Sequence, residues 1–254
     1  MVIISKDNEN VKHIKKLKDK KYREQYNEYV VEGLKLINEA IEEAKQVKTV
    51  VICDECIKRG QIEQKDLYKI AKYNCIYVNE NLFSSLSDVE THQGILAVIS
   101  KETEKQEINY DEDVIVILDG VSDPGNVGTI LRTVDSTGLK QVIVSDDTVD
   151  IYNPKVIRGA MGATFRVNIV RSTNLVNTIK EIKKHKYNIY GTVLDTESKS
   201  IYDVEYKKVA IVIGNEANGI SEEVLKEVKE KIKIPMLRKN REFECRCCNG
   251  YCSI

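Results

Sequence analysis

Two bends rich in glycine and polar side chains follow apolar stretches, and they hold the residues best suited to chemistry. The first is LDGVSDPGNVGTILR, residues 118–132, which ends in Arg132. The second is VAIVIGNEANGI, residues 209–220, which contains Glu216. Glycine allows a ligand to approach the backbone closely, and the start of a helix offers free N–H groups. The two bends predict a ligand site served by a guanidinium and a carboxylate.

Each bend alone has a simpler explanation. Asn126 is expected to be a helix N-cap, and a glutamate in a turn, such as Glu216, is usually solvated. Arg132 lies six residues after Asn126, so we expect its guanidinium to reach the start of the same helix. The glycine spacing departs from G-x-G-x-x-G, which disfavours a dinucleotide-binding loop.

The elements that must position these bends are apolar, β-branched runs that alternate with helical stretches. This pattern predicts an α/β fold with a mostly parallel sheet and helices on both faces, and ligands bind at the carboxyl ends of such strands. The predicted strands are 114–118, 141–145, 167–170, 188–193, 209–214 and 231–235. The predicted helices follow from the segments NVGTILRTVDSTG, NPKVIRGAMGA, TNLVNTIKEIKKH and SEEVLKEVKEK.

Residues 1–104 are expected to form a smaller α/β domain, which residues 105–113 link to a second domain at 114–254. Its segment 11–23 holds seven Lys or Arg residues and one acid, and its apolar residues fit one stripe of a helix. Such a run is either a solvated helix face or a phosphate-contacting helix, and the segment alone favours neither.

The composition limits the class of protein. With 39 basic and 40 acidic residues, the net charge is -1, so any nucleic-acid surface must be local. The sequence shows no signal peptide and no apolar run that could span a bilayer, so we expect a cytoplasmic protein without membrane contact. Its seven cysteines have neither the pairing of a disulfide framework nor the spacing of a zinc site, and no metal is expected.

The motifs resemble those of a known family. Asn126, Gly128 and Arg132 form the pattern N-x-G-x-x-x-R, which resembles the first motif of the SpoU (TrmH-like, SPOUT-class) RNA methyltransferases. IGNEANG resembles their second motif, IKIPML (232–237) the opening of the third, and RGAMGA (158–163) their R-A-S-A-G-A segment. The N-terminal half, with YVVEG and THQG, is similar to the family's L30e-like substrate-binding domain.

The resemblance implies the transfer of a methyl group from S-adenosylmethionine to a ribose 2′-OH of RNA, with ribosomal RNA preferred over transfer RNA. It also implies a trefoil knot and a homodimer, in which the substrate domain of one subunit serves the catalytic cleft of the other. The implied catalytic residues are Arg132, Asn126 and Glu216. The implied cofactor-binding residues are Gly214, Asn215, Glu216, Gly219, Ile234 and Met236. The implied RNA-binding residues are Lys12, Lys15, Lys16, Lys18, Arg23 and Arg158.

The third motif breaks off after Leu237. Family members continue with a segment like G-x-x-x-S-L-N-V and an apolar helix, whereas residues 238–254 are RKNREFECRCCNGYCSI. With one permitted set of codons, skipping the first nucleotide of this segment gives GKTESLNVDVAMAIALY, which restores the motif. We therefore interpret residues 238–254 as an out-of-frame tail, which would disrupt the knot.

Two alternatives to an active enzyme remain. One is an RNA-binding protein of the same fold that is catalytically impaired by the missing motif. The other is an unrelated α/β nucleotide-binding protein whose glycine turns mimic the motifs.

Overall fold

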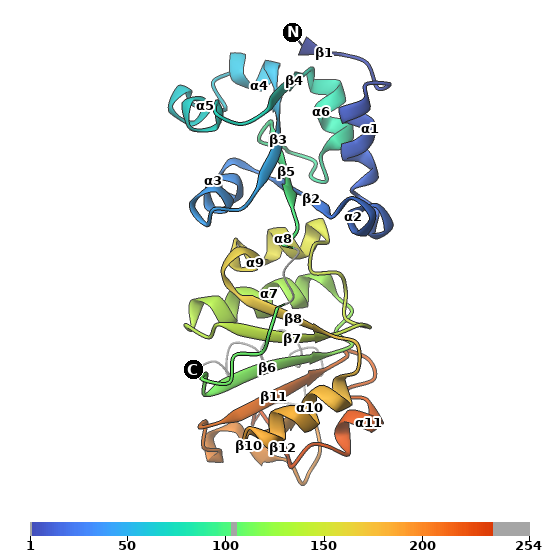
Figure 1. Ribbon diagram of the computed structural model, residues 1–254, viewed down its shortest axis with the longest axis vertical. Coiled ribbons are helices and arrows are strands. Elements are labelled where there is room, and N and C mark those ends of the chain that lie inside the picture. Colours follow the sequence, from blue (N-terminus) through green and yellow to red (C-terminus); the bar gives the residue numbers. More distant parts are fainter. Residues whose placement is uncertain (1, 103–105, 236–254) are drawn as a thin grey trace. The chain divides into compact units, whose positions relative to one another are not determined.

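The computed structural model describes residues 2–102 and 106–235. Their contacts divide them into two compact units (Figure 1). The first unit holds the described residues up to 102 together with Tyr152–Arg158, and the second holds the other described residues. The segment Tyr152–Arg158 therefore groups with the N-terminal unit although it lies far along the chain.

The first unit is built on a five-stranded sheet with the order β1-β4-β3-β5-β2, in which β5 pairs antiparallel with β2 and β3. Helices α1 and α6 pack their apolar side chains on one face of it. The strands are β1 (Val2–Ile3), β2 (Glu28–Glu32), β3 (Val47–Cys53), β4 (Cys75–Val78) and β5 (Ile95–Ser100). The helices are α1 (Glu9–Lys16), α2 (Lys20–Tyr26), α3 (Leu34–Glu42), α4 (Asp54–Lys58), α5 (Gln64–Ile70) and α6 (Glu80–Leu86).

The basic segment 11–23 forms two helices, so the expectation of a single helix is wrong. Helix α1 is capped at Leu17, and the side chain of Asp19 starts α2 by accepting a hydrogen bond from the Lys21 N–H at 2.9 Å. The predicted apolar stripe is confirmed, because Val11, Ile14 and Leu17 are buried. The stripe ends where the chain turns.

The second unit is a seven-stranded sheet with the order β10-β12-β9-β11-β6-β7-β8, and each of its described pairings is parallel. The predicted parallel α/β fold is confirmed, since all six predicted strands are present. The strands are β6 (Val114–Asp119), β7 (Gln141–Ser145), β8 (Asn168–Ser172), β9 (Asn188–Thr192), β10 (Lys199–Ser200), β11 (Val209–Gly214) and β12 (Glu230–Lys233). The helices are α7 (Pro124–Ser136), α9 (Ala163–Arg166), α10 (Leu175–Lys184), the 3-10 helix η1 (Ile201–Asp203) and α11 (Glu222–Leu225). Helix α8 (Pro154–Ala160) falls largely in the segment Tyr152–Arg158, which groups with the first unit.

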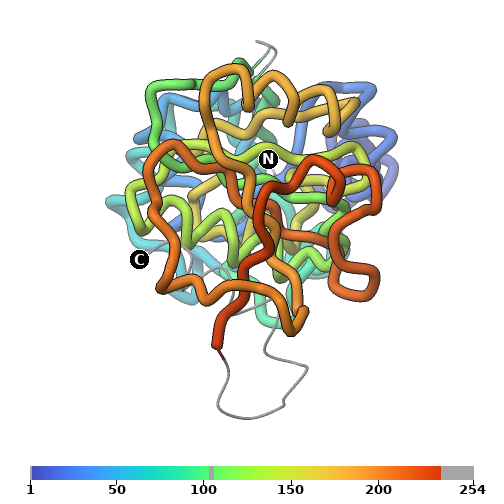
Figure 2. Tube along the Cα trace, turned by 90° about the horizontal axis from the view of Figure 1, so that it is seen from below, coloured from blue at the N-terminus to red at the C-terminus, as the bar shows by residue number. Residues whose placement is uncertain are grey.

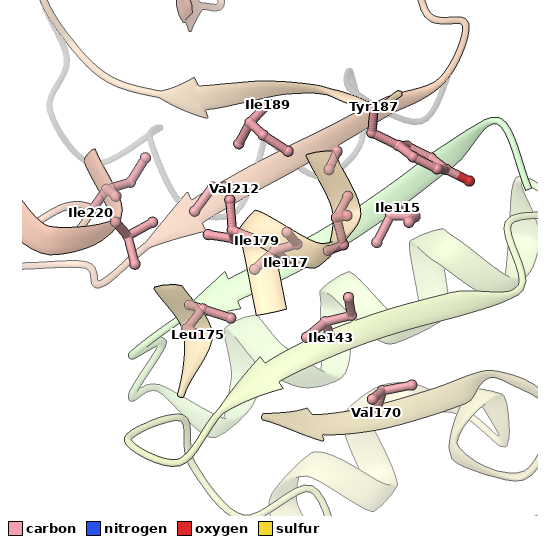
Figure 3. Close-up of a cluster of buried hydrophobic side chains, with 13 residues drawn as sticks. Ile115, Ile117, Ile143, Val170, Leu175, Ile179, Tyr187, Ile189, Val212 and Ile220 are labelled. Carbon is pink, nitrogen blue, oxygen red and sulfur yellow. The ribbon is translucent and has the colours of Figure 1, made fainter. Parts of the chain in front are cut away.

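Helices α10 and α11 cover one face of this sheet. Ile179 of α10 lies over Ile117 of β6 and Val212 of β11 in a buried hydrophobic cluster (Figure 3). Side chains alternate along a strand, so Val116 and Leu118 face the opposite side. Helix α7, whose buried residues lie outside that cluster, packs on β7 and α9.

The last part of the unit differs from expectation. The predicted helix after Ser221 is only four residues long, because the Lys229 N–H donates to the Ile189 carbonyl and draws the chain into β12. Figure 2 looks onto the β10 and β12 edge, where the orange-to-red segment from β9 to β12 is outermost. The segments on which the predicted knot and the out-of-frame tail depend, after Pro235, lie outside the described residues.

No described helix is both long and apolar enough to cross a membrane.

The core of the second unit should be sensitive to truncation at α10. We expect Ile179→Ala to lower the free energy of unfolding by about 2–5 kcal/mol, because Ile179 is fully buried and its removal leaves a cavity. Urea denaturation followed by circular dichroism measures this change. The matched control is Tyr202→Ala, whose side chain is 67% exposed and should change stability by at most about 0.5 kcal/mol.

Candidate active site

The two glycine-rich bends meet at the carboxyl edge of the second sheet. Strands β6 and β11 are parallel neighbours, and their last residues, Asp119 and Gly214, are paired in register. Both chains therefore leave the sheet at the same level. The expectation that the bends lie together is confirmed.

The side chain of Glu216 joins the bends. One carboxylate oxygen accepts hydrogen bonds from the backbone N–H of Ser122 at 3.1 Å and from its hydroxyl at 3.0 Å. The other accepts from the backbone N–H of Asp123 at 3.1 Å and from the side-chain amide of Asn126 at 2.9 Å. Four donors on one carboxylate fix its ionised form in place.

These donors explain the acidity of Glu216. Burial of the carboxyl group would raise its pKa, but the hydrogen bonds from Asn126, Ser122 and Asp123 outweigh that effect and lower the pKa to about 2. The group is therefore charged at neutral pH and is a poor proton acceptor. Glu216 holds the site together rather than acting as a base.

Two further contacts link the same bends. The side-chain amide of Asn215 donates to the Gly120 carbonyl at 2.8 Å, while its oxygen accepts from the backbone N–H groups of Ala217 and Asn218. The carboxylate of Asp119 accepts from the Ser221 N–H at 2.7 Å. Sequence reasoning missed Asp119 and Ser122, because an acid and a serine in a turn have no distinctive spacing.

Gly214 is required by the turn itself. A Cβ atom at this position would lie 2.2 Å from the carbonyl carbon of Gly219 and 2.3 Å from the nitrogen of Ile220. Asn215 and Gly219 exchange two backbone hydrogen bonds of 2.9 and 2.8 Å across the turn, and Gly219 has a φ of +71°. The glycines thus close the turn, and residues 216–219 remain exposed at its tip.

Asn126 is not the N-cap of α7, as had been expected. Asp123 occupies that position and accepts a hydrogen bond from the Asn126 N–H at 2.8 Å, and Pro124 begins the helix. The Asn126 side chain is 5% exposed and its amide nitrogen faces Glu216. Its oxygen is buried and has no hydrogen-bond partner among the described residues.

Arg132 lies on the other side of the same helix. It is six residues beyond Asn126, which turns its side chain about 240° around the helix axis, and it is exposed. It lies nine residues after the N-cap, about 13 Å along the axis. A hydrogen bond brings Asn126 and Glu216 together, whereas the Arg132 guanidinium makes no hydrogen bond or ion pair with any described residue.

A third loop emerges at this edge after β12. Strand β9 lies between β11 and β12 and pairs with both. Ile234, just after β12, is therefore two strand spacings, about 10 Å, from the Gly214 turn. Between them, after β9, lies Leu194, which is 61% exposed. Exposed backbone and an apolar side chain fit a ligand with a flat ring and hydrogen-bonding edges. The other predicted cofactor residue of this loop, Met236, lies outside the described residues.

The predicted RNA-binding residues fall into two groups. Arg23 is 3% exposed, and its guanidinium donates to the carbonyls of Leu17 and Lys18 at 2.8 and 2.7 Å. It caps the end of α1, so we exclude it from a phosphate-contacting surface. The others remain at least partly exposed: Lys12, Lys15, Lys16, Lys18 and Arg158.

Comparisons with known proteins agree with this arrangement. Residues 113–243 match the SpoU rRNA Methylase family, and residues 8–97 match an MRM3-like substrate binding domain. The chain belongs to the SpoU family. This excludes the unrelated nucleotide-binding protein as an explanation of the motifs.

A named relative and a solved structure cover nearly the whole chain. The 23S rRNA (guanosine(2553)-2'-O)-methyltransferase RlmP of Bacillus subtilis is 32% identical over 92% of this chain and 90% of its own. The AdoMet-bound rRNA methyltransferase from Sinorhizobium meliloti superposes with a TM-score of 0.81 at 26% identity, over 100% of this chain and 95% of that one. In this SpoU protein, no group of three or more described His, Cys, Asp or Glu residues could hold a metal ion.

The charge of Glu216 should stabilise the protein in a definite pH range. The folded-state pKa, about 2, lies below the ordinary value of 4.5, so the contribution is complete above about pH 4.5 and is lost as the pH falls toward 2. We therefore expect Glu216→Gln to lower the urea midpoint at pH 7 and to differ less from wild type at pH 3. A pH-independent difference would show that the carboxylate charge is not what joins the bends.

Proposed function

We propose that this SpoU protein transfers a methyl group from S-adenosylmethionine to a ribose 2′-OH of RNA. The observation that carries the proposal is the hydrogen bond between Asn126 and Glu216. It joins the N-x-G-x-x-x-R helix to the GNEANG turn at the carboxyl edge of a parallel sheet. The similarity to RlmP and to the AdoMet-bound methyltransferase supports this activity.

The cofactor is held at the loops after β11 and β12. The exposed tip of the Gly214–Gly219 turn would offer backbone C=O groups, because the N–H groups of Ala217, Asn218 and Gly219 already donate to Asn215. Ile234 with Met236 would contribute the second loop. Asn215 shapes the turn through its own hydrogen bonds, which leaves the backbone as the recognising surface. The ring of the adenosine would pack on the exposed apolar side chain between these loops.

The cofactor supplies a methyl group already activated on a positively charged sulfur. The protein would have to align the ribose oxygen with that methyl, so that the carbon–sulfur bond breaks as the carbon–oxygen bond forms and the hydroxyl proton passes to solvent. Arg132 is a poor base because a guanidinium has a pKa above about 12. It instead orients the 2′-OH and a neighbouring phosphate and stabilises the developing negative charge on the oxygen. Asn126 and Glu216 act with it by holding the start of α7.

The substrate is ribosomal RNA, held by the N-terminal unit and by Arg158. The relative named above methylates 23S rRNA, and the substrate binding domain matches residues 8–97. The protein acts as a homodimer in the cytoplasm, where the substrate domain of one subunit serves the cleft of the other. This would bring Arg132, which has no hydrogen bond to Glu216 within one chain, to a shared substrate.

Arg132→Ala tests the central role. We expect kcat to fall by about a hundredfold or more, because a donor to a developing oxyanion is lost, while RNA affinity stays nearly unchanged. Methyl transfer from tritiated S-adenosylmethionine to ribosomal RNA measures the first effect, and filter binding measures the second. Arg171→Ala is the control, since Arg171 is another exposed arginine and pairs with Asp146. Wild-type turnover in Arg132→Ala would remove Arg132 from the mechanism.

A second candidate function is RNA binding without catalysis. It rests on the tail 238–254, which lacks the S-L-N-V segment of the family and lies outside the described residues. A one-nucleotide frameshift after Leu237, whether a mutation or a sequencing error, accounts for this tail. Resequencing the gene and measuring the intact mass of the native protein test the frameshift. An unshifted gene that encodes the cysteine-rich tail would remove it.

Cofactor affinity separates the two functions. Isothermal calorimetry compares the chain as printed with a chain that carries GKTESLNVDVAMAIALY in place of residues 238–254. If the tail is out of frame, only the chain with the replaced tail should bind S-adenosylmethionine. Equal affinity of both chains would show that the third motif is dispensable for binding the cofactor.

A further inference from the structure

Three lysines on α1 and α2 have charged groups with no carboxylate partner among the described residues. They are Lys15 and Lys16, at the end of α1, and Lys21, in the first turn of α2. Lys16 and Lys21 are exposed, and Lys15 is half-buried. Unpaired ammonium groups so close together repel one another unless an anion binds between them.

The neighbouring lysines differ from these three. Lys12 lies 3.4 Å from Asp7, Lys18 lies 3.0 Å from Asp88, and Lys20 lies 3.8 Å from Glu24. The single acid of the segment, Asp19, uses its carboxylate to cap α2. Within residues 11–23, the unpaired positive charge therefore falls on Lys15, Lys16 and Lys21.

The ring of Tyr22 lies within that part. The Nζ atom of Lys16 is 5.7 Å from its centroid and that of Lys21 is 5.8 Å from it. The ring is half-buried and nearly parallel to that of Tyr26, with an angle of 14° and a centroid distance of 6.2 Å.

Tyr26 is itself held in place. The imidazole of His13 meets its ring edge-on at 4.6 Å, and the Nε2 atom of His13 lies 2.6 Å from the Glu28 carboxylate. Tyr22 thus rests on a fixed aromatic neighbour, which limits the side-chain entropy that it would lose on binding a ligand.

We propose that Tyr22 is a stacking site for an unpaired base of the RNA substrate, with Lys16 and Lys21 holding the phosphates on either side of that nucleotide. Lys15 adds charge to the same surface. This inference rests on the proposed function and narrows its substrate to RNA with an unpaired nucleotide at the N-terminal unit.

The tyrosine is what distinguishes this surface from a general phosphate site. Lysines alone bind duplex and single-stranded RNA through the backbone, with little regard for the bases. The faces of paired bases are hidden within a duplex, whereas an unpaired base can stack on an aromatic ring. A ring with two unpaired ammonium groups within 5.8 Å of its centroid offers both contacts to one nucleotide.

The experiment uses the full chain and two fluorescent RNAs with equal numbers of phosphates, a hairpin with an unpaired loop and a fully paired duplex. We expect Tyr22→Leu to weaken binding of the hairpin by about tenfold, because stacking contributes about 1–3 kcal/mol per base. Binding of the duplex should change little. Tyr22→Phe keeps the ring and should behave as wild type.

The lysines are tested through salt dependence. Lys16→Gln and Lys21→Gln should each reduce the slope of log affinity against log salt concentration by about one, for both RNAs. Helix α5 offers matched controls in Tyr68→Leu and Lys69→Gln, which remove an exposed tyrosine and an exposed lysine elsewhere on the same unit. These controls should match wild type in both measurements.

The stacking site is overturned if Tyr22→Leu binds the hairpin with wild-type affinity, or if it loses affinity equally for the hairpin and the duplex. A wild-type chain that binds neither RNA would overturn it as well. Methylation assays separate this result from the proposed function. A chain that methylates RNA regardless of Tyr22 keeps the function and loses the stacking site. A chain that binds the hairpin through Tyr22 but transfers no methyl group to any RNA keeps the stacking site and loses the proposed function.

Discussion

The carboxylate of Glu216, with its four hydrogen-bond donors, is the interaction on which the catalytic end of the molecule depends. Parallel pairing of β6 and β11 brings the bends to one level but does not set their conformations. Glu216 does so, because Ser122 and Asp123 point their N–H groups at it and Asn126 turns its amide nitrogen toward it. Each of these donors would otherwise need another acceptor, so the ionised acid organises the start of α7.

Because Glu216 is hydrogen-bonded to one side of α7, the two sides of this helix have different roles. The inward side is used for structure. Asn126 is buried and hydrogen-bonded to Glu216, and Gly128 lies so close to Gly159 that a Cβ on Gly159 would be 3.3 Å from the Gly128 Cα. The outward side carries Arg132 next to Thr129 and Thr133, whose hydroxyls donate to carbonyls of their own helix. No carboxylate of the described residues neutralises that guanidinium, so it remains free for an anionic substrate.

The sequence predicted those parts of the fold that depend on local pattern. The apolar runs at 141–145 and 209–214 became β7 and β11 with the same bounds, because continuous β-branched residues suit a strand buried on both faces. The helix after Ser221 was overestimated, since a long-range hydrogen bond from Lys229 to β9 overrides its helical periodicity. The N-cap of α7 was misassigned because three capping residue types occur within five positions. The partners of Glu216, some 90 residues away, depend on strand register, which no local pattern contains.

The structure of the basic segment 11–23, in the N-terminal unit, likewise depends on more than its local sequence pattern, and this determines which of its side chains meet. In one continuous helix, residues six positions apart, such as Lys16 and Tyr22, point in different directions and do not meet. The break after Leu17 lets the Lys16 ammonium approach the Tyr22 ring. Two charged residues, which the sequence alone would place on a solvated helix face, stabilise this break. Asp19 caps α2, and Arg23 is buried against the Leu17 and Lys18 carbonyls that follow α1. In a chain with a net charge of -1, a polyanion must be attracted locally. Here the capping Asp19 and the buried Arg23 set the positions of the lysines that remain on the surface.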